Sequence, residues 1–216
     1  MEINTITLRN ALPAVFKGEA ATPSDVWRTD LTLQKGKHYI ISAESGTGKS
    51  SLCAYIYGSR TDYEGEILFN NDNIKSLAIK DWQAIRRTSL AYLPQDLGLF
   101  PELTAWENIV LKNNLTGHLT AEQIEDFLKR LGIGHRRDFP VGKMSIGQQQ
   151  RVGIIRAICQ PFDFIFLDEP VSHLDEHNNR IVASIIEEEA RKQNAAVIST
   201  SVGNHLLLDN PEFVNI

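Results

Sequence analysis

A glycine-rich segment of the sequence carries residue types that bind phosphate. Residues 43–51 read Ala-Glu-Ser-Gly-Thr-Gly-Lys-Ser-Ser and follow an apolar stretch. Glycines let successive backbone N–H groups turn toward one anion, and the start of a helix adds partial positive charge. In such a loop Lys49 would reach the β- and γ-phosphates of a nucleotide, and the Ser50 hydroxyl would bind Mg²⁺. The candidate residues of this phosphate-binding loop are Ser45, Gly46, Thr47, Gly48, Lys49, Ser50 and Ser51.

Two adjacent acids after an apolar run are typical of a phosphoryl-transfer site. Residues 164–169 read Phe-Ile-Phe-Leu-Asp-Glu. One acid at a strand end can hold Mg²⁺, often through water, and the next can orient and polarise an attacking water molecule. We assign Asp168 to the metal and Glu169 to the general base. Two acids that begin a solvated turn would explain this segment equally well on its own, but the phosphate-binding loop upstream favours catalysis.

Periodicity and capping signals define the elements that must position these residues. A helix is expected from Lys49 to Gly58, since glycine suits the left-handed position after a helix. Thr120 begins another as part of a capping box, and a third starts near Ser145. The predicted strands are residues 3–8, 26–33, 38–43, 65–69, 162–167 and 195–200. Strands that alternate with helices predict an α/β fold with a mainly parallel sheet, and the mostly helical region of about 95–157 is expected to form a subdomain.

The composition is that of an ordinary globular protein. The chain has 216 residues, of which 42% are apolar and 23% charged, and its formal charge is −5. The negative charge gives no reason to expect nucleic-acid binding. No apolar run approaches the ~18–20 residues of a membrane-spanning helix, and residues 1–5 do not resemble a secretory signal. Cys53 and Cys159 are expected to be buried free thiols. We therefore expect a cytoplasmic protein, so that any membrane part must come from another chain.

Further motifs, in the same order along the chain, resemble the ABC-type ATPase family. Residues 92–96 (Tyr-Leu-Pro-Gln-Asp) look like the family's Q-loop, and residues 99–109 are similar to the segment that follows it. Residues 144–151 (Met-Ser-Ile-Gly-Gln-Gln-Gln-Arg) look like the signature motif, and residues 171–175 resemble the D-loop. Phe16 lies about where the family places an aromatic residue that stacks on adenine. The resemblance covers nearly the whole chain.

The resemblance implies a fold and a set of site residues. The fold would be an ABC-type P-loop NTPase, a single nucleotide-binding domain over residues 1–216. It would have a mainly parallel central sheet, an antiparallel β-rich N-terminal part and a helical subdomain over approximately residues 95–157. Gln95 would contact Mg²⁺ and the attacking water. Ser145, Gly147 and Gln148 would face the γ-phosphate of ATP held by another subunit. A capping box formed by Ser145 and Gln148 is also the ordinary start of a helix, so this motif has a purely structural explanation as well.

The same resemblance implies partners and a location. Two copies of the domain would enclose two ATP molecules between them, so a homodimer is expected. An integral membrane permease would provide the only contact with the membrane, on the cytoplasmic face of the inner membrane. The segment from Gln95 to Asn108 looks most similar to the lipoprotein-release, macrolide-export and cell-division branch. A soluble ABC-type ATPase acting on DNA or ribosomes is disfavoured, because the chain has one cassette and an acidic charge.

Three positions depart from the family pattern. Ala43 replaces the first glycine of the phosphate-binding loop, and Ile146 replaces the first glycine of the signature. Ser201 stands where the family usually has a histidine that supports hydrolysis, and His205 follows four residues later. A serine can donate one hydrogen bond but cannot carry a charge, so ATP hydrolysis is expected to be slow. A degenerate regulatory ATP-binding subunit, paired with a competent partner, is the alternative function.

Overall fold

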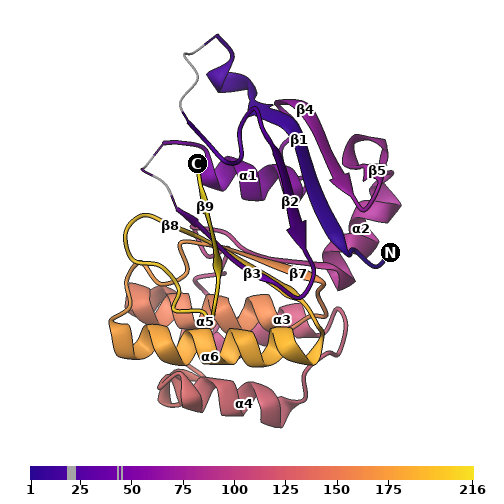
Figure 1. The fold of residues 1–216 in the computed structure, drawn as a ribbon. Helices are drawn as coiled ribbons and strands as arrows, with labels where there is room; N and C mark the ends of the chain where they lie inside the picture. The colour runs from indigo at the N-terminus through magenta and orange to yellow at the C-terminus, as the bar shows by residue number, and fades with distance from the viewer. Residues whose placement is uncertain (19–22, 43, 45) are drawn as a thin grey trace.

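The computed structural model describes residues 1–18, 23–42, 44 and 46–216. Among these residues an N-terminal segment rich in strands precedes alternating helices and strands (Figure 1). The helices are α1 (Lys49–Ile56), α2 (Ile79–Thr88), α3 (Ala105–Asn113), α4 (Ala121–Arg130), α5 (Ile146–Ile158) and α6 (Glu176–Lys192). The strands are β1 (Thr5–Pro13), β2 (Asp30–Gln34), β3 (His38–Ser42), β4 (Tyr63–Phe69), β5 (Asp72–Asn73), β6 (Leu90–Leu93), β7 (Phe164–Asp168), β8 (Ala196–Ser201) and β9 (Glu212–Asn215).

A parallel sheet forms the centre of the fold. Its strand order is β6-β7-β8-β3-β9, and every neighbouring pair runs parallel. Strands β7 and β8 are buried along their whole length, which explains why β7 is an apolar run up to Asp168 and why β8 begins with three apolar residues in succession rather than with an alternating pattern. Because all strands of the sheet point the same way, the loops that follow β3, β6, β7 and β8 meet at one edge.

The two faces of the parallel sheet face different layers (Figure 1). Side chains alternate along a strand, so Ile165 and Leu167 contact the helical side with α3 to α6, while Phe164 and Phe166 contact the other. The second side is covered by α1 and the antiparallel sheet. Both faces of the parallel sheet are therefore buried, and this packing positions the strand ends at the edge that carries the candidate site.

The antiparallel sheet has the order β2-β1-β4-β5. The pairing of β1 with β4 shifts register between Arg9 and Leu12. At this irregularity Gly65 has a φ of 79°, and a Cβ there would lie 2.3 Å from the carbonyl oxygen of Asn10. Only glycine fits so close an approach of two backbones.

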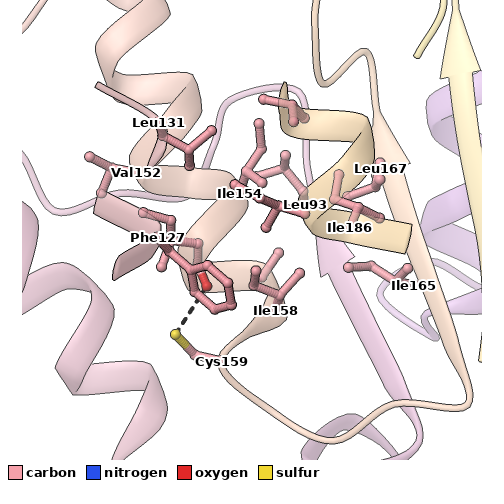
Figure 2. Packing of buried hydrophobic residues seen from close by; sticks show 14 of the residues in the cluster. Leu93, Phe127, Leu131, Val152, Ile154, Ile158, Cys159, Ile165, Leu167 and Ile186 are labelled. Atoms are coloured by element: carbon pink, nitrogen blue, oxygen red, sulfur yellow. Dashed lines mark hydrogen bonds between the residues drawn. The ribbon is translucent and has the colours of Figure 1, made fainter. Parts of the chain in front are cut away.

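The helical side is joined to the sheet by continuous apolar packing. Figure 2 shows Phe127 and Leu131 meeting Val152, Ile154 and Ile158 from α5, with Ile165 and Leu167 of β7 beyond them. Both Cys53 and Cys159 are buried and free, as predicted. The Cys159 thiol donates to the carbonyl of Ile155.

The α/β fold, its mainly parallel sheet, its antiparallel N-terminal part and its helical subdomain are confirmed. The predicted strand 26–33 is wrong at its start, because residues 26–29 form a turn and β2 begins at Asp30. Helix α2 and strands β5, β6 and β9 were not predicted. The single-domain assignment 1–216 and the subdomain limits of about 95–157 stay predictions. Within the described ranges, no helix is both long and apolar enough to span a membrane.

Candidate functional site

The predicted phosphate-binding loop connects β3 to α1. Gly46 and Gly48 have φ values of 87° and 100°, in the region that favours glycine. Lys49 begins α1 and is 5% exposed, and its Nζ donates to the carbonyl of Glu44 at 2.7 Å. The Thr47 hydroxyl donates to the same carbonyl at 2.9 Å. The side chains of Thr47 and Lys49 thus share one backbone acceptor within the loop. Ser45 and Ala43 lie outside the described residues.

A cleft of about 480 Å³ brings the predicted metal-binding residues together. Ser50 comes from the first turn of α1, Gln95 from the loop after β6, and Asp168 from the end of β7. The remaining lining residues are Ser51, Ala54, Arg60, Tyr92, Pro94 and Asp96. A hydroxyl, an amide and a carboxylate offer the oxygen donors that Mg²⁺ prefers.

Asp168 and Glu169 are fixed by a threonine of the neighbouring strand. The Thr200 hydroxyl donates to Asp168 Oδ1 at 2.6 Å and accepts a hydrogen bond from the backbone N–H of Glu169 at 3.2 Å. Asp168 is 2% exposed and Thr200 is fully buried. The pairing of β7 with β8 places Asp168 directly opposite Thr200. The carboxylate of Asp168 is therefore held in one orientation at the cleft.

Glu169 has an unusual backbone conformation. Its φ is 52°, in the left-handed region that residues other than glycine rarely adopt. The Glu169 carbonyl accepts hydrogen bonds from the Ser172 hydroxyl at 3.2 Å and from Gln150 Nε2 at 3.5 Å. Such strain persists only where the surroundings determine the conformation, and it gathers at functional sites.

The signature residues lie at the start of α5 and do not line the cleft. The Ser145 hydroxyl accepts from the Gln148 N–H at 3.4 Å, and Gln148 Oε1 accepts from the Ser145 N–H at 3.1 Å. A Cβ on Gly147 would lie 3.1 Å from the carbonyl oxygen of His173, so the start of α5 packs against the D-loop of the same chain. Ser145 and Ile146 are exposed. Gly147 and Gln148 are partly buried.

Two aromatic rings lie against the phosphate-binding loop. A Cβ on Gly48 would lie 3.2 Å from Cε2 of Phe16 and 3.1 Å from Cζ2 of Trp27. The Trp27 Nε1 donates to the carbonyl of Thr47 at 2.9 Å. Phe16 is partly buried, so a base could stack on its remaining surface.

Ser201 closes β8 and is 3% exposed. In the sheet register it lies opposite Ser42, the last residue of β3 before the phosphate-binding loop. His205 lies further along the chain, with its ring 5.7 Å from the ring of Phe213. The structure therefore brings Ser201, and not His205, to the strand end beside the loop.

The pKa values of the buried thiol and phenol near the cleft are raised. Burial, together with the charge of Asp168, raises the pKa of the Cys53 thiol well above its ordinary value. Burial likewise raises the pKa of Tyr92, which lines the cleft. Both groups are thus neutral at physiological pH. In the described part of the chain no three His, Cys, Asp or Glu side chains cluster into a metal site of their own.

The family model described as "ABC transporter" matches residues 26–172 of the chain. This match covers the phosphate-binding loop, the cleft residue Gln95, the signature and the acidic pair. The chain belongs to the ABC transporter family. Members of this family are ATP-binding ATPases, and the predicted resemblance is confirmed.

Several known proteins resemble the chain over most of its length. The lipoprotein-releasing system ATP-binding proteins LolD of Shewanella denitrificans and Saccharophagus degradans are 29% and 31% identical, over 88% and 86% of this chain and 82% and 85% of those proteins. The macrolide export ATP-binding/permease protein MacB of Marinobacter nauticus is 29% identical over 90% of this chain and 31% of its own length. These relatives confirm the resemblance to the lipoprotein-release and macrolide-export branch.

A solved structure shows the same fold. The dimeric structure of MJ0796, a bacterial ABC transporter cassette, superposes with a TM-score of 0.75 at 26% identity, covering 90% of this chain and 87% of that one. The match confirms the ABC-type P-loop NTPase fold of the chain.

Three residues of the site were missed by the sequence reasoning. Thr200 was assigned only to a strand, and Trp27 was placed in a strand that proves to be a turn. Arg60, whose guanidinium donates to the Ser51 hydroxyl at 2.9 Å, was not singled out. A threonine at the end of a buried strand is a weak signal for an acid partner, and the other two carried none.

Proposed function

We propose that the chain binds MgATP at this cleft and hydrolyses it to ADP and phosphate, as the ATPase subunit of a transporter whose permease is a separate membrane protein. The observation that carries the proposal is the meeting of Ser50, Gln95 and Asp168 in one cleft beside the phosphate-binding loop. These residues come from three distant parts of the sequence, and nothing in local structure requires them to meet.

The proposed roles follow from the chemistry of each group. Backbone N–H groups of Gly46, Thr47 and Gly48 would hold the phosphates, with Lys49, Ser45, Ser50 and Ser51 around them. Mg²⁺, bound by Ser50, Gln95 and Asp168, would supply neutralising charge on the phosphate oxygens. Phe16 would stack on adenine.

Hydrolysis is assigned to residues around the acidic pair. Glu169 would act as general base toward a water molecule oriented by Gln95, and Ser201 would donate one hydrogen bond. The absence of the family's usual histidine leaves the developing charge less well balanced, so we propose a low turnover rate.

The position of Ser145, Gly147 and Gln148 outside the cleft supports a dimer. Since these residues lie outside the chain's own cleft, they would complete the ATP site of a second copy. ATP would then favour the closed dimer by adding contacts that only this state makes. Closure would drive a permease, which would hold the subunit on the cytoplasmic face of the cell membrane.

A second candidate is a regulatory subunit that binds ATP without useful turnover. Ile146, exposed at 49% within the signature, and Ser201 favour it. Such a subunit would pair with a catalytically competent partner, and only one of the two ATP sites would hydrolyse ATP.

The test is MgATP hydrolysis by the purified chain over a range of protein concentrations. Glu169→Gln is the matched control, because it keeps the size of the side chain and removes the base. A rate per subunit that rises with concentration, and that vanishes in the control, supports an ATPase assembled by dimerisation. ATP binding with no turnover above the control would support the regulatory candidate. A chain that does not bind ATP would contradict both candidate functions.

A further inference from the structure

Trp27 is joined to the phosphate-binding loop by a hydrogen bond and by ring contact. Its Nε1 donates to the carbonyl of Thr47 at 2.9 Å, and the residue is 8% exposed. Its Cζ2 and Nε1 atoms lie 3.1 and 3.2 Å from the position that a Cβ on Gly48 would occupy. The indole is enclosed and its N–H bonds to one carbonyl. Its position is therefore specific and is not explained by apolar burial alone.

The turn that carries Trp27 is built to hold it there. The Ser24 hydroxyl accepts the N–H groups of Val26 and Trp27 at 3.1 and 2.9 Å. Arg28 has a φ of 61°, and its N–H donates to the carbonyl of Ala11 at 2.9 Å. The left-handed residue directly after Trp27 costs free energy that the surrounding bonds must offset. This arrangement is the reason why a strand predicted from residue 26 gives way to a turn.

The C-terminal strand secures the same turn. The Asp25 N–H donates to the carbonyl of Asn215 at 2.8 Å, and the Asn215 N–H donates to Asp25 Oδ2 at 2.9 Å. The turn is therefore fastened on both sides, to β1 and to β9. The hydrogen bonds on both sides of the turn hold Trp27 in place against the phosphate-binding loop.

The planar peptide group between Thr47 and Gly48 links the Trp27 hydrogen bond to phosphate binding. The carbonyl of Thr47 and the N–H of Gly48 belong to one trans peptide, so they point in opposite directions. With the carbonyl held by the indole, the Gly48 N–H points away from Trp27. Backbone N–H groups of such a loop bind an anion only when they are turned toward it. Holding one end of the peptide sets the direction of the other.

We propose that Trp27 is a positioning residue for nucleotide binding: by holding the Thr47 carbonyl it orients the Gly48 N–H toward the phosphates. The proposal rests on the proposed ATP site and adds a residue to it. Trp27 does not touch the phosphates. Its effect is greatest on ligands that carry phosphate, because the Gly48 N–H donates a hydrogen bond to phosphate.

The sharpest test replaces the indole N–H and nothing else. 3-Benzothienylalanine at position 27 keeps the bicyclic ring and puts sulfur in place of the N–H, whereas the simpler variant Trp27→Phe removes the N–H together with one ring. The same replacement at Trp106, a ring packed against the helical cluster, is the matched control. The measurements are the dissociation constants of ATP and of pyrophosphate, KM and kcat for ATP, and the melting temperature.

The expected result is a rise of about three- to tenfold in KM and in both dissociation constants, the loss that corresponds to one hydrogen bond. The melting temperature and kcat stay near those of the native chain, and the Trp106 replacement changes none of them. Unchanged affinity at position 27, or a fall in affinity that only accompanies a fall in melting temperature, overturns the proposal. If the native chain binds neither ATP nor pyrophosphate, the proposed function itself fails.

Discussion

The hydroxyl of Thr200 donates a 2.6 Å hydrogen bond to the carboxylate of Asp168, and both residues are buried. A buried carboxylate is costly unless it is hydrogen-bonded or paired with a cation. The two residues lie on neighbouring strands in direct register, so the sheet itself fixes the bond. The acid that we assign to Mg²⁺ is therefore oriented before any ligand arrives.

Thr200→Val keeps the shape of the side chain and removes this bond. We expect Mg²⁺-dependent ATP hydrolysis to fall by about tenfold or more, since a hydrogen bond to a charged group contributes about 1.5–3 kcal/mol. The measurement is the ATPase rate as a function of Mg²⁺ concentration. Thr200→Ser is the control and should stay close to the native rate. A valine variant with the native rate and the native Mg²⁺ dependence would contradict the role of this bond.

Ser201 gives a second prediction, about rate rather than binding. Ser201→Ala should lower kcat about three- to tenfold, because one hydrogen bond is lost, and should leave the dissociation constant of ATP unchanged. Ser201→His restores a side chain that can carry charge and should raise kcat. Single-turnover hydrolysis separates these effects from product release. Equal kcat in all three stably folded forms would remove Ser201 from the catalytic residues.

Two neighbouring tyrosines predict opposite effects on stability. Their rings lie 5.0 Å apart, yet the Tyr55 hydroxyl donates to the carbonyl of Asp62 at 3.0 Å, while the buried Tyr63 hydroxyl has no partner among the described residues. Tyr55→Phe should destabilise by about 0.5–1.5 kcal/mol. Tyr63→Phe should be neutral or stabilise by up to about 1 kcal/mol, because it removes an unpaired buried polar group.

Urea unfolding at neutral pH measures both tyrosine variants against the native chain. The result that would contradict this pair of predictions is a Tyr63→Phe chain less stable than the Tyr55→Phe chain. Such a result would mean that the Tyr63 hydroxyl has a partner, such as a buried water molecule.

Tyr63 also predicts a loss of stability at alkaline pH. Burial raises the pKa of Tyr63 from 10.0 to about 12. Between these values the unfolded chain releases the phenolic proton and the folded chain keeps it, so the free energy of unfolding falls as pH rises. The contribution of this group is about 1.4 kcal/mol per pH unit at most.

The measurement for this pH dependence is the unfolding free energy of the native chain and of Tyr63→Phe at neutral pH and above pH 10. Because the phenylalanine variant has no proton to lose at this position, its advantage over the native chain should grow above pH 10 and be constant below it. A constant difference over the whole range would show that the pKa of Tyr63 is not raised.

Much of the site could be predicted because its signals are local. The glycines around Lys49 bend the backbone within one loop, and the apolar run before Asp168 and Glu169 identifies a strand buried on both faces. The capping box of Ser145 and Gln148 also lies within one turn of helix, and the structure forms it as expected.

The rest depends on partners that are distant in the sequence. Thr200 becomes important only because β8 lies beside β7, and no pattern near Thr200 reveals that neighbour. Residues 26–29 look like the start of a strand, but their hydrogen bonds to Ser24 and Ala11 favour a turn, which Asp25 fastens to Asn215. Helix α2 was missed although Trp82 and Ile85, three residues apart, pack against the same apolar cluster.

The hydrogen bond between Asp25 and Asn215 joins two segments that lie 190 residues apart in the sequence. The turn that holds the phosphate-binding loop is fastened only when β9 has paired beside β3. Affinity for ATP should therefore appear late in folding, after this long-range contact has formed.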